Sequence, residues 1–126
     1  MRSLLLDTNV VVWLLVDDRR SISGSALAAL EDEDNRTFVS AASVWEIAIK
    51  RSLGNLDLDP RWAAVLTGLD FDRLPVTSEH AAYVEHLPWH HRDPFDRLLV
   101  AQAIVEGDAL VTSDRRLRTY GVDVVW

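Results

Sequence analysis

The sequence predicts an α/β fold in which a central parallel sheet lies between two layers of helices. Short apolar runs of strand length alternate with longer runs of helical periodicity, and this alternation is typical of βαβ units. The first apolar run ends in three consecutive leucines, as expected of a strand that is buried on both faces. The 126 residues are close to the commonest size for one domain, so we expect a single domain over residues 1–126.

In the first half of the chain, each short apolar run is followed by a run with a recognisable helix start or end. Ser21 and Ser23 are N-cap candidates for a second helix. Gly54 with Asn55 has the form of a helix C-terminal cap. The expected elements are a strand over Ser3–Leu6, a helix over residues 8–16, a helix ending near Glu31, a strand over residues 37–39 and a helix over residues 41–53.

In the second half, prolines and glycines mark the boundaries of the elements. Asp59 and Pro60 suit the cap and first position of a helix. Asp93 and Pro94 open a strong amphipathic helix that Gly107 closes. The expected elements are helices over residues 60–68, 77–87 and 94–105, strands over residues 71–74, 109–112 and 122–125, and a short turn or helix over residues 114–117.

Composition excludes several function classes. The chain has no cysteine, so disulfides, cysteine zinc sites and a thiol nucleophile are excluded. The net charge of −7 means that bulk charge does not attract nucleic acid. Any binding of nucleic acid would need local arginines or bound cations. The longest apolar run near the N-terminus, residues 10–16, is shorter than the ~20 residues of a membrane helix. We expect no membrane association and a cytoplasmic protein.

Four acidic residues are placed where a parallel sheet would bring them together. Asp7 and Asp114 directly follow two expected strands, and Glu46 and Asp96 lie in the early turns of two helices. These positions face the same edge of the sheet, where open α/β folds bind ligands. Carboxylates gathered at one edge repel one another unless a cation neutralises them. Oxygen ligands without cysteine favour Mg²⁺ or Mn²⁺, which can activate water and neutralise a phosphodiester.

Each acid also has a purely structural interpretation, because carboxylates are common at helix starts and in turns. If all four acids were purely structural, four separate structural explanations would have to apply by chance at the same edge of the sheet. The alternatives are Asp7 as a helix N-cap, Glu46 as the partner of Ser43 in a capping box, Asp96 as an acid favoured by the helix N-terminus with Asp93 as the cap, and Asp114 as a turn residue.

Four segments of the chain match a known family in order and spacing. The chain resembles PIN-domain ribonucleases, and within them the VapC-type toxins of bacterial toxin–antitoxin pairs. The resemblance spans nearly the whole chain. The segments are residues 4–9 (LLLDTN), 43–50 (SVWEIAIK), 91–102 (HRDPFDRLLVAQ) and 110–114 (LVTSD).

The resemblance implies a PIN-like, Rossmann-like α/β/α fold, usually dimeric. It implies cleavage of single-stranded RNA with Mg²⁺ or Mn²⁺, which inhibits translation or growth, and a VapB-like cognate antitoxin as partner. By position, the acidic set that binds the metal and carries catalysis is Asp7, Glu46, Asp96 and Asp114, with Asp7 and Asp96 the most dependable ligands. The polar residues that align with such sites are Thr8, Asn9 and Thr112.

The remaining polar residues near the motifs have open assignments. We assign Asp93 to helix capping and to a pairing with Arg97. Arg97 and Arg115, with Arg92, Arg116 and Arg118, either contact RNA phosphates or form a solvated face. The residues expected outside the chemistry are His90 and His91 in an exposed loop, and Trp13 and Trp45 in the core or at a dimer interface.

Two other functions fit part of the pattern. A Mg²⁺-dependent phosphohydrolase also places aspartates at strand ends, but it usually requires a lysine after a later strand. The single lysine, Lys50, lies one helical turn after Glu46 and is expected to pair with it. A catalytically inactive PIN-like binding module is the second alternative, and the complete acid set argues against it.

Overall fold

A five-stranded parallel sheet forms the centre of the computed structural model, which describes residues 1–126. Every neighbouring pair of strands is parallel, and the strand order is β3-β2-β1-β4-β5. The sheet confirms the α/β fold class expected from the sequence. The strands are β1 (Ser3–Leu6), β2 (Arg36–Ser40), β3 (Asp72–Leu74), β4 (Ala109–Val111) and β5 (Val124–Val125).

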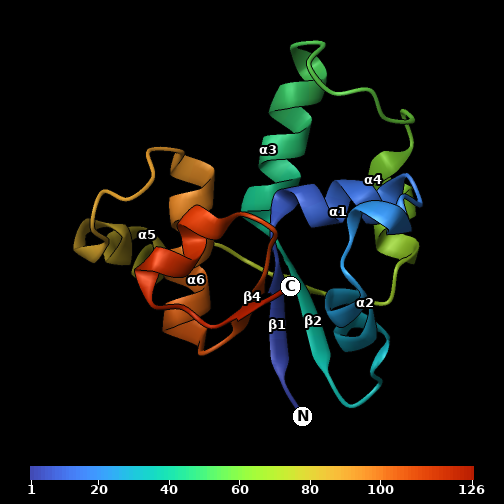
Figure 1. Cartoon of the computed structure of the whole chain (residues 1–126). Helices are drawn as coiled ribbons and strands as arrows, with labels where there is room; N and C mark the ends of the chain where they lie inside the picture. Colours follow the sequence, from blue (N-terminus) through green and yellow to red (C-terminus); the bar gives the residue numbers. More distant parts are fainter.

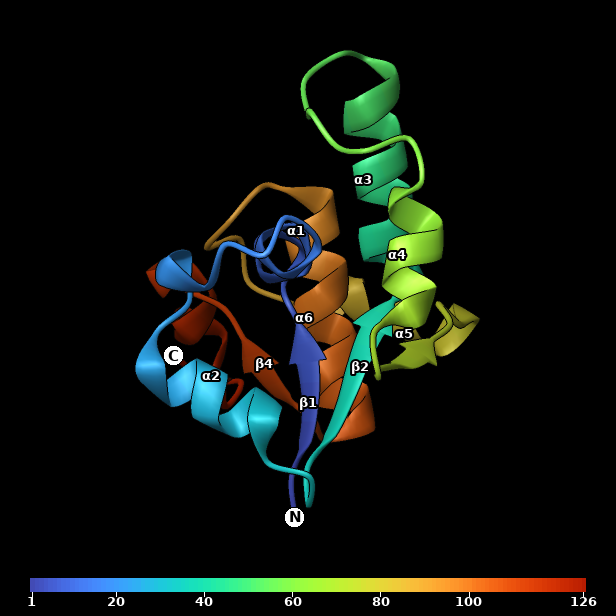
Figure 2. The ribbon, with the colours of Figure 1, turned by 90° about the vertical axis from the view of Figure 1, so that its right-hand side faces the viewer.

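Helices lie on both faces of this sheet (Figures 1 and 2). None of them combines the length and the apolarity that a membrane crossing requires. The α-helices are α1 (Thr8–Leu15), α2 (Gly24–Glu31), α3 (Ala41–Ser52), α4 (Trp62–Gly68), α5 (Ser78–Tyr83) and α6 (Pro94–Glu106). Three 3₁₀ helices cover Arg19–Ser21, Val84–His86 and Arg115–Tyr120.

The three leucines of β1 divide the core into two parts. Leu4 and Leu6 belong to a cluster that includes apolar residues of α1, α2 and α4. Leu5 belongs to a second cluster, built with residues of α6 and the last 3₁₀ helix. Successive side chains of a strand point to opposite faces, so alternate leucines serve the two layers. All three are completely buried, as a run without a polar face predicts.

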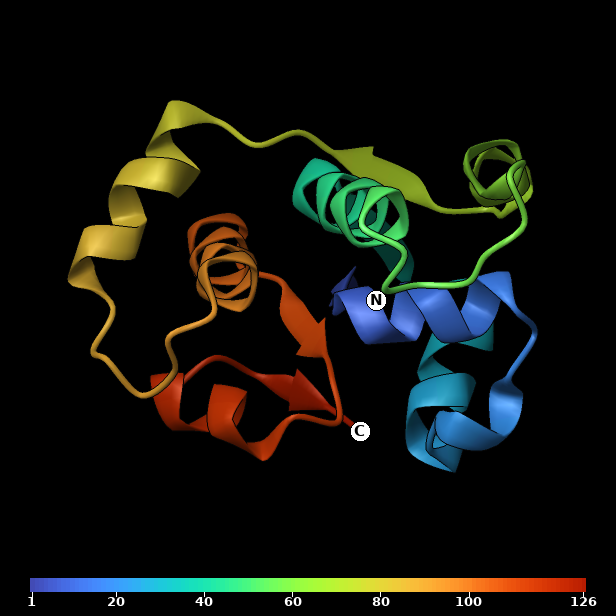
Figure 3. The same cartoon turned by 90° about the horizontal axis from the view of Figure 1, so that it is seen from above.

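The order in which the chain adds strands to the sheet changes sides at β1. From β1 the chain adds β2 and then β3 on one side, and it returns through α6 to place β4 on the other side of β1. Ligands of open α/β sheets bind outside the carboxyl ends of the strands at such a reversal. Figure 3 looks onto this end of the sheet and shows α1, α3 and α6 gathered around it.

Most helix ends follow the capping signals in the sequence. The Ser23 side chain accepts from the Ala26 amide at the start of α2, while Ser21 lies in a separate 3₁₀ helix. Gly54 has a φ of 76°, and Asn55 donates to the Lys50 carbonyl over 2.9 Å. This left-handed glycine with its long backbone bond is a Schellman cap, as the Gly-Asn pair indicates.

Two helix boundaries differ from the sequence-based expectation. The helix expected from Pro60 begins at Trp62, because the Asp59 carboxylate accepts from the Arg61 amide and forms a turn before the helix. The helix expected over residues 77–87 changes after Tyr83 from α to 3₁₀. Such a 3₁₀ ending is frequent at helix C-termini.

A buried polar network joins the sheet to the helices near the same end. Gln102 on α6 is completely buried, and its side-chain oxygen accepts from the Ser40 hydroxyl over 2.5 Å. Its amide nitrogen lies 3.3 Å from the Pro75 carbonyl and 3.3 Å from Nδ1 of His80. One side chain therefore satisfies polar groups from β2, from the loop after β3 and from α5.

We expect Gln102→Leu to lower the free energy of unfolding by about 1–3 kcal/mol, the usual cost of leaving buried polar groups unpaired. The substitution keeps an apolar stem of similar length but removes the partners of Ser40 and Pro75. Urea unfolding of the variant and the unsubstituted chain measures the difference. An unchanged midpoint and slope would show that the network does not contribute to stability.

Candidate active site

Asp7 lies at the carboxyl end of the sheet, where the pairing of β1 with β4 fixes its position. Its backbone amide donates to the Val111 carbonyl over 2.9 Å, directly beyond the last residue of β1. The Thr112 hydroxyl, immediately after β4, donates to Asp7 Oδ2 over 2.7 Å. Thr112, which the resemblance aligned with polar site residues, is therefore in direct contact with Asp7.

Asp7 does not act as a helix cap. It occupies the N-cap position of α1, but its side chain makes no capping hydrogen bond. The structural alternative for this residue is therefore wrong. Burial raises the pKa of the Asp7 carboxyl, and the hydrogen bond from Thr112 opposes that rise. The negative charges of Glu46 and Asp114 raise the pKa of Asp7 further, because they repel the ionised form of its carboxyl group.

Glu46 enters the site from the second turn of α3. Ser40, not Ser43, caps this helix by accepting from the Ala42 amide. Ser43 instead accepts from the Thr8 hydroxyl over 2.9 Å. The capping box expected as the alternative for Glu46 is therefore absent, and the side chain must be buried for another reason.

The two oxygens of the Glu46 carboxylate have different surroundings. Its Oε2 pairs with Lys50 Nζ at 2.7 Å, the helical pairing expected from the sequence. Its Oε1 is buried and accepts no hydrogen bond. Glu46 as a whole is only 4 % exposed. A buried carboxylate oxygen without a partner is rare in folded proteins and indicates a position prepared for an ion or a polar ligand.

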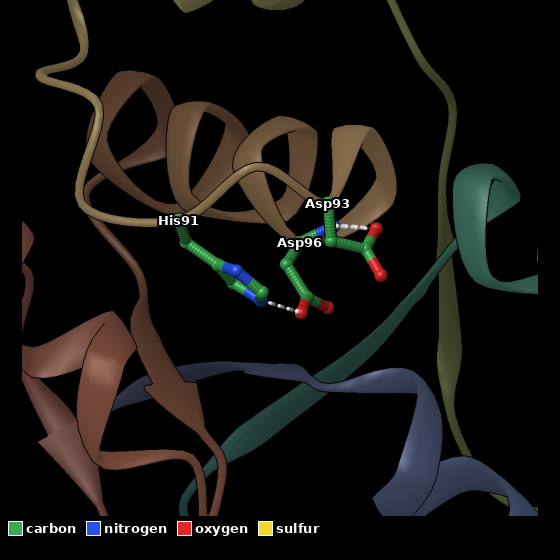
Figure 4. Close-up of side chains that lie close together, drawn as sticks. All are labelled: His91, Asp93 and Asp96. Carbon is green, nitrogen blue, oxygen red and sulfur yellow. Dashed lines mark hydrogen bonds and ion pairs between the residues drawn. The ribbon is translucent and has the colours of Figure 1, made fainter.

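Asp96 lies in the first turn of α6, and Asp93 caps that helix (Figure 4). The Asp93 side chain accepts from the amides of Phe95 and Asp96 at 2.8 and 3.2 Å, as the sequence predicted. Asp96 Oδ2 lies 2.7 Å from Nε2 of His91. Burial raises the pKa of Asp96 to about 6, and the ionised Asp7 and Asp93 add to the rise.

Asp114 has both a structural bond and a place in the site. Its carboxylate accepts from the Arg116 amide over 2.9 Å, which starts the last 3₁₀ helix. The Arg116 guanidinium adds two contacts at 2.9 and 3.1 Å. These hydrogen bonds lower the pKa of Asp114. The turn interpretation is therefore correct, and it does not remove Asp114 from the site, because the side chain also lines the cavity described next.

The four acids line one cavity of about 180 Å³ that has no hydrophobic wall. Asp93 lines it too, and only Lys50 and Arg116 bring fixed positive charge. Carboxylate oxygens in this number suit a hard divalent cation. The lining residues are Asp7, Thr8, Asn9, Glu46, Lys50, His91, Asp93, Asp96, Asp114 and Arg116.

The arginines near the motifs lie in different environments. Arg97 does not pair with Asp93 and does not reach the cavity; it is 2 % exposed and donates to the carbonyls of Val84, Leu87 and Pro88. Its role as a phosphate contact is therefore wrong. Arg115 is exposed but does not line the cavity, whereas its neighbour Arg116 does.

Sequence reasoning also missed the role of His91. The residue was expected in an exposed loop, yet its ring is largely buried and bonded to Asp96. The only sequence signal is its position two residues before the cap of α6. Of the two tryptophans expected in the core or an interface, Trp13 packs against Trp126, while Trp45 is 60 % exposed beside Phe95.

One protein family and one ribonuclease match most of this chain. The family model of the PIN domain matches residues 4–122. Ribonuclease VapC22 of Mycobacterium tuberculosis is 34% identical over 123 residues, which cover 95% of this chain and 93% of that protein.

Solved structures of VapBC proteins share the fold. VapBC2 from Rickettsia felis, bound to a promoter DNA fragment, aligns with a TM-score of 0.74 at 16% identity, covering 97% of this chain and 96% of the other. VapBC-1 from nontypeable Haemophilus influenzae aligns with a TM-score of 0.71 at 13% identity and the same coverage. These two likenesses concern the fold alone. Together with the family model and the relative at 34% identity, they lead to one conclusion: the chain belongs to the PIN-domain family, among its VapC-type members.

Proposed function

We propose that this protein is a divalent-metal-dependent endoribonuclease that cleaves single-stranded regions of RNA as the toxin of a toxin–antitoxin pair. The observation that carries the proposal is the meeting of Asp7, Glu46, Asp96 and Asp114 in one polar cavity, in a chain similar to a ribonuclease. In this proposal, residues 1–126 form one PIN domain. RNA cleavage by such a toxin inhibits translation or growth, and it takes place in the cytoplasm.

The donor set of the cavity fits Mg²⁺ or Mn²⁺. Asp7 and Asp96 are the principal ligands in this proposal, and Asp114 and Glu46 complete the set. The unpartnered Glu46 Oε1 supports the fit, because it is a buried acceptor beside these acids. The raised pKa values of Asp7 and Asp96 also support it, since a bound cation would stabilise both ionised forms.

The residues divide the work of hydrolysis. When bound, the ion supplies a more acidic water and a positive charge beside the scissile phosphodiester. Glu46 Oε1, which has no partner in the protein, positions the attacking water or a second ion. Lys50 and Arg116 line the cavity and face the phosphate charge. The water oxygen bonds to phosphorus as the bond from phosphorus to the 3′ oxygen breaks. One proton of the water ends on the departing 3′ oxygen, which leaves a 5′-phosphate and a 3′-hydroxyl.

The polar residues around the acids either contact the RNA or hold other site residues in place. Asn9 is exposed at the cavity and contacts the RNA backbone in this proposal. Thr8 and Thr112 are buried and hold Ser43 and Asp7 through their hydroxyls. Arg115, exposed beside Arg116, contacts phosphates outside the cavity.

The partners follow from the similarity to VapBC proteins. The structures from Rickettsia felis and Haemophilus influenzae are of VapBC proteins, and we infer a VapB-like cognate antitoxin for this chain. We also infer a homodimer, the usual state that the family resemblance implies. A phosphohydrolase or an inactive module is less well supported, because Lys50 is paired with Glu46 and all four acids are present.

Asp7→Asn tests the nuclease directly. We expect cleavage of single-stranded RNA with Mg²⁺ or Mn²⁺ to fall at least ~100-fold, which corresponds to ~3 kcal/mol of lost metal-dependent stabilisation. The amide oxygen of asparagine still accepts from Thr112, and a buried charge is removed. The variant should therefore melt at the same or a higher temperature without metal. RNA cleavage and thermal unfolding are measured on the same preparation.

Asp72→Asn is the matched control. Asp72 is an exposed carboxylate at the start of β3, at the other end of the sheet, where it pairs with Arg36. We expect this variant to cleave RNA normally. Undiminished cleavage by Asp7→Asn would contradict the proposal. Turnover of a small phosphate ester with no RNA cleavage would favour a phosphohydrolase, and no binding of Mg²⁺ or Mn²⁺ in calorimetry would favour an inactive module.

The pKa of Asp96 predicts how metal binding depends on pH. The folded-state pKa of about 6 lies above the ordinary value of 3.8, so ionised Asp96 destabilises the metal-free fold above about pH 6. This destabilisation disappears as the pH falls below about 4. A divalent ion binds the ionised form and must compete with protons below about pH 6. The increase in melting temperature caused by Mg²⁺ should therefore be larger at about pH 8 than at about pH 5.

Thermal unfolding with and without Mg²⁺ across this pH range measures the effect. Asp96→Asn serves as the comparison, since it removes the titrating group and should remove most of the Mg²⁺ effect at every pH. An equal Mg²⁺ effect on the unsubstituted chain at both ends of the range would show that Asp96 does not bind the ion.

A further inference from the structure

The imidazole of His91 lies between two acids of the cavity. Its Nε2 is 2.7 Å from Asp96 Oδ2 and 3.8 Å from Asp114 Oδ2 (Figure 4 shows the first contact). The other oxygen of Asp96, Oδ1, accepts no hydrogen bond from the protein. His91 therefore binds one oxygen of a carboxylate whose second oxygen is left free.

The hydrogen bonds of the ring define which nitrogen carries the proton. Nδ1 of His91 accepts from the backbone amide of Arg92 over 3.1 Å. A backbone amide can only donate, so Nδ1 must use its lone pair in this bond. The proton of the neutral ring is then on Nε2, where it points at Asp96 Oδ2. His91 is thus built as a hydrogen-bond donor to Asp96.

The backbone of His91 is fixed by the half-buried Tyr120 and the buried Arg97. Its amide donates to the Tyr120 hydroxyl over 2.9 Å, and its carbonyl lies 3.4 Å from both that hydroxyl and the Arg97 guanidinium. Arg97 is buried and lies 3.9 Å from the centre of the Trp89 ring. The loop before α6 is therefore held in place by Arg97, which lies neither in a solvated face nor at the cavity.

We propose that His91 positions the Asp96 carboxylate: its Nε2–H holds Oδ2 in place and so presents Oδ1 to the divalent ion. Donors that hold metal-binding side chains in this way usually strengthen metal binding substantially. The inference rests on the proposed function, because it assumes that Asp96 binds the ion. His91 is a positioning residue and does not itself touch the ion.

Direct coordination by His91 is the competing arrangement. One ligand atom each from His91, Asp93 and Asp96 can lie within 4.8 Å of one another, which is close enough for a shared ion. Coordination through Nε2 would need a lone pair on that nitrogen, and the proton would have to move to Nδ1. The Arg92 amide would then face an N–H group and lose its acceptor. The hydrogen bonds therefore favour the donor role.

Mn²⁺ added to the full chain distinguishes the two arrangements without a variant. The free-ion signal in electron paramagnetic resonance measures the affinity, and pulsed spectra of the bound ion detect any directly coordinated nitrogen. We expect bound Mn²⁺ with no nitrogen ligand. The coupling of a coordinated imidazole nitrogen would overturn the proposal.

Two substitutions at His91 test the positioning role. His91→Leu removes the donor at similar volume and should weaken Mn²⁺ binding roughly 10- to 100-fold. His91→Gln places an amide N–H near the former Nε2 and should bind Mn²⁺ markedly more tightly than the leucine variant. His86→Leu, at an exposed histidine that contacts no acid of the cavity, is the matched control and should bind normally. Melting without metal verifies that each variant is folded.

The outcomes separate this inference from the proposed function. If the unsubstituted chain does not bind Mn²⁺, the proposed metal site is wrong. If it binds Mn²⁺ and a folded His91→Leu binds it equally well, only the positioning role is wrong. Should His91→Leu not fold, Tyr120→Phe replaces it, since this variant removes the hydroxyl that fixes the His91 backbone. Unchanged Mn²⁺ affinity in Tyr120→Phe would then overturn the inference.

Discussion

Repulsion among carboxylates that a parallel sheet brings to one edge is the constraint on which this structure depends. Three acids of the cavity each have a nitrogen partner: Glu46 has Lys50, Asp96 has His91 and Asp114 has Arg116. Asp7, which is almost completely buried, accepts a hydrogen bond from the Thr112 hydroxyl and has no cationic partner. The protein thus places a cationic side chain beside Glu46 and Asp114, and gives Asp96 and Asp7 hydrogen-bond donors that carry no fixed positive charge. A cation bound beside Asp7 would supply the charge that the protein does not provide.

The fold holds this arrangement through the two innermost strands. β1 and β4 are neighbours only because the chain returns through α6 after β3, and their pairing continues past β1 to the bond between the Asp7 amide and Val111. The same register places the Thr112 hydroxyl against Asp7 Oδ2. Leucines packed on both faces keep these strands buried, so Asp7 cannot turn out to solvent. The packing of the core therefore determines the geometry of the acids.

Sequence patterns predicted what depends on local signals. Alternating runs gave the parallel sheet, and Asp93, Pro94 and Gly107 marked both ends of α6 correctly. The positions of Arg97 and His91 could not be predicted in this way. Arg97 is buried because the loop before α6 and the 3₁₀ helix ahead of it turn several carbonyls toward it, and His91 faces Asp96 because that loop is held by Tyr120. The positions of both residues depend on tertiary contacts between loop segments, and the local sequence pattern does not predict the course of those loops.

The partners of the acids differ in how easily they can move. The side chains of Lys50 and Arg116 are 47% and 63% exposed, so each can leave its carboxylate at little cost when a phosphate or a cation competes for either member of the pair. Thr112 and His91 are buried or largely buried and are fixed by other hydrogen bonds. The exposed partners are thus the charged ones, and the buried partners are the donors that bond to Asp7 and Asp96. In the proposed function, this division would let Lys50 and Arg116 exchange partners while Asp7 and Asp96 keep their geometry.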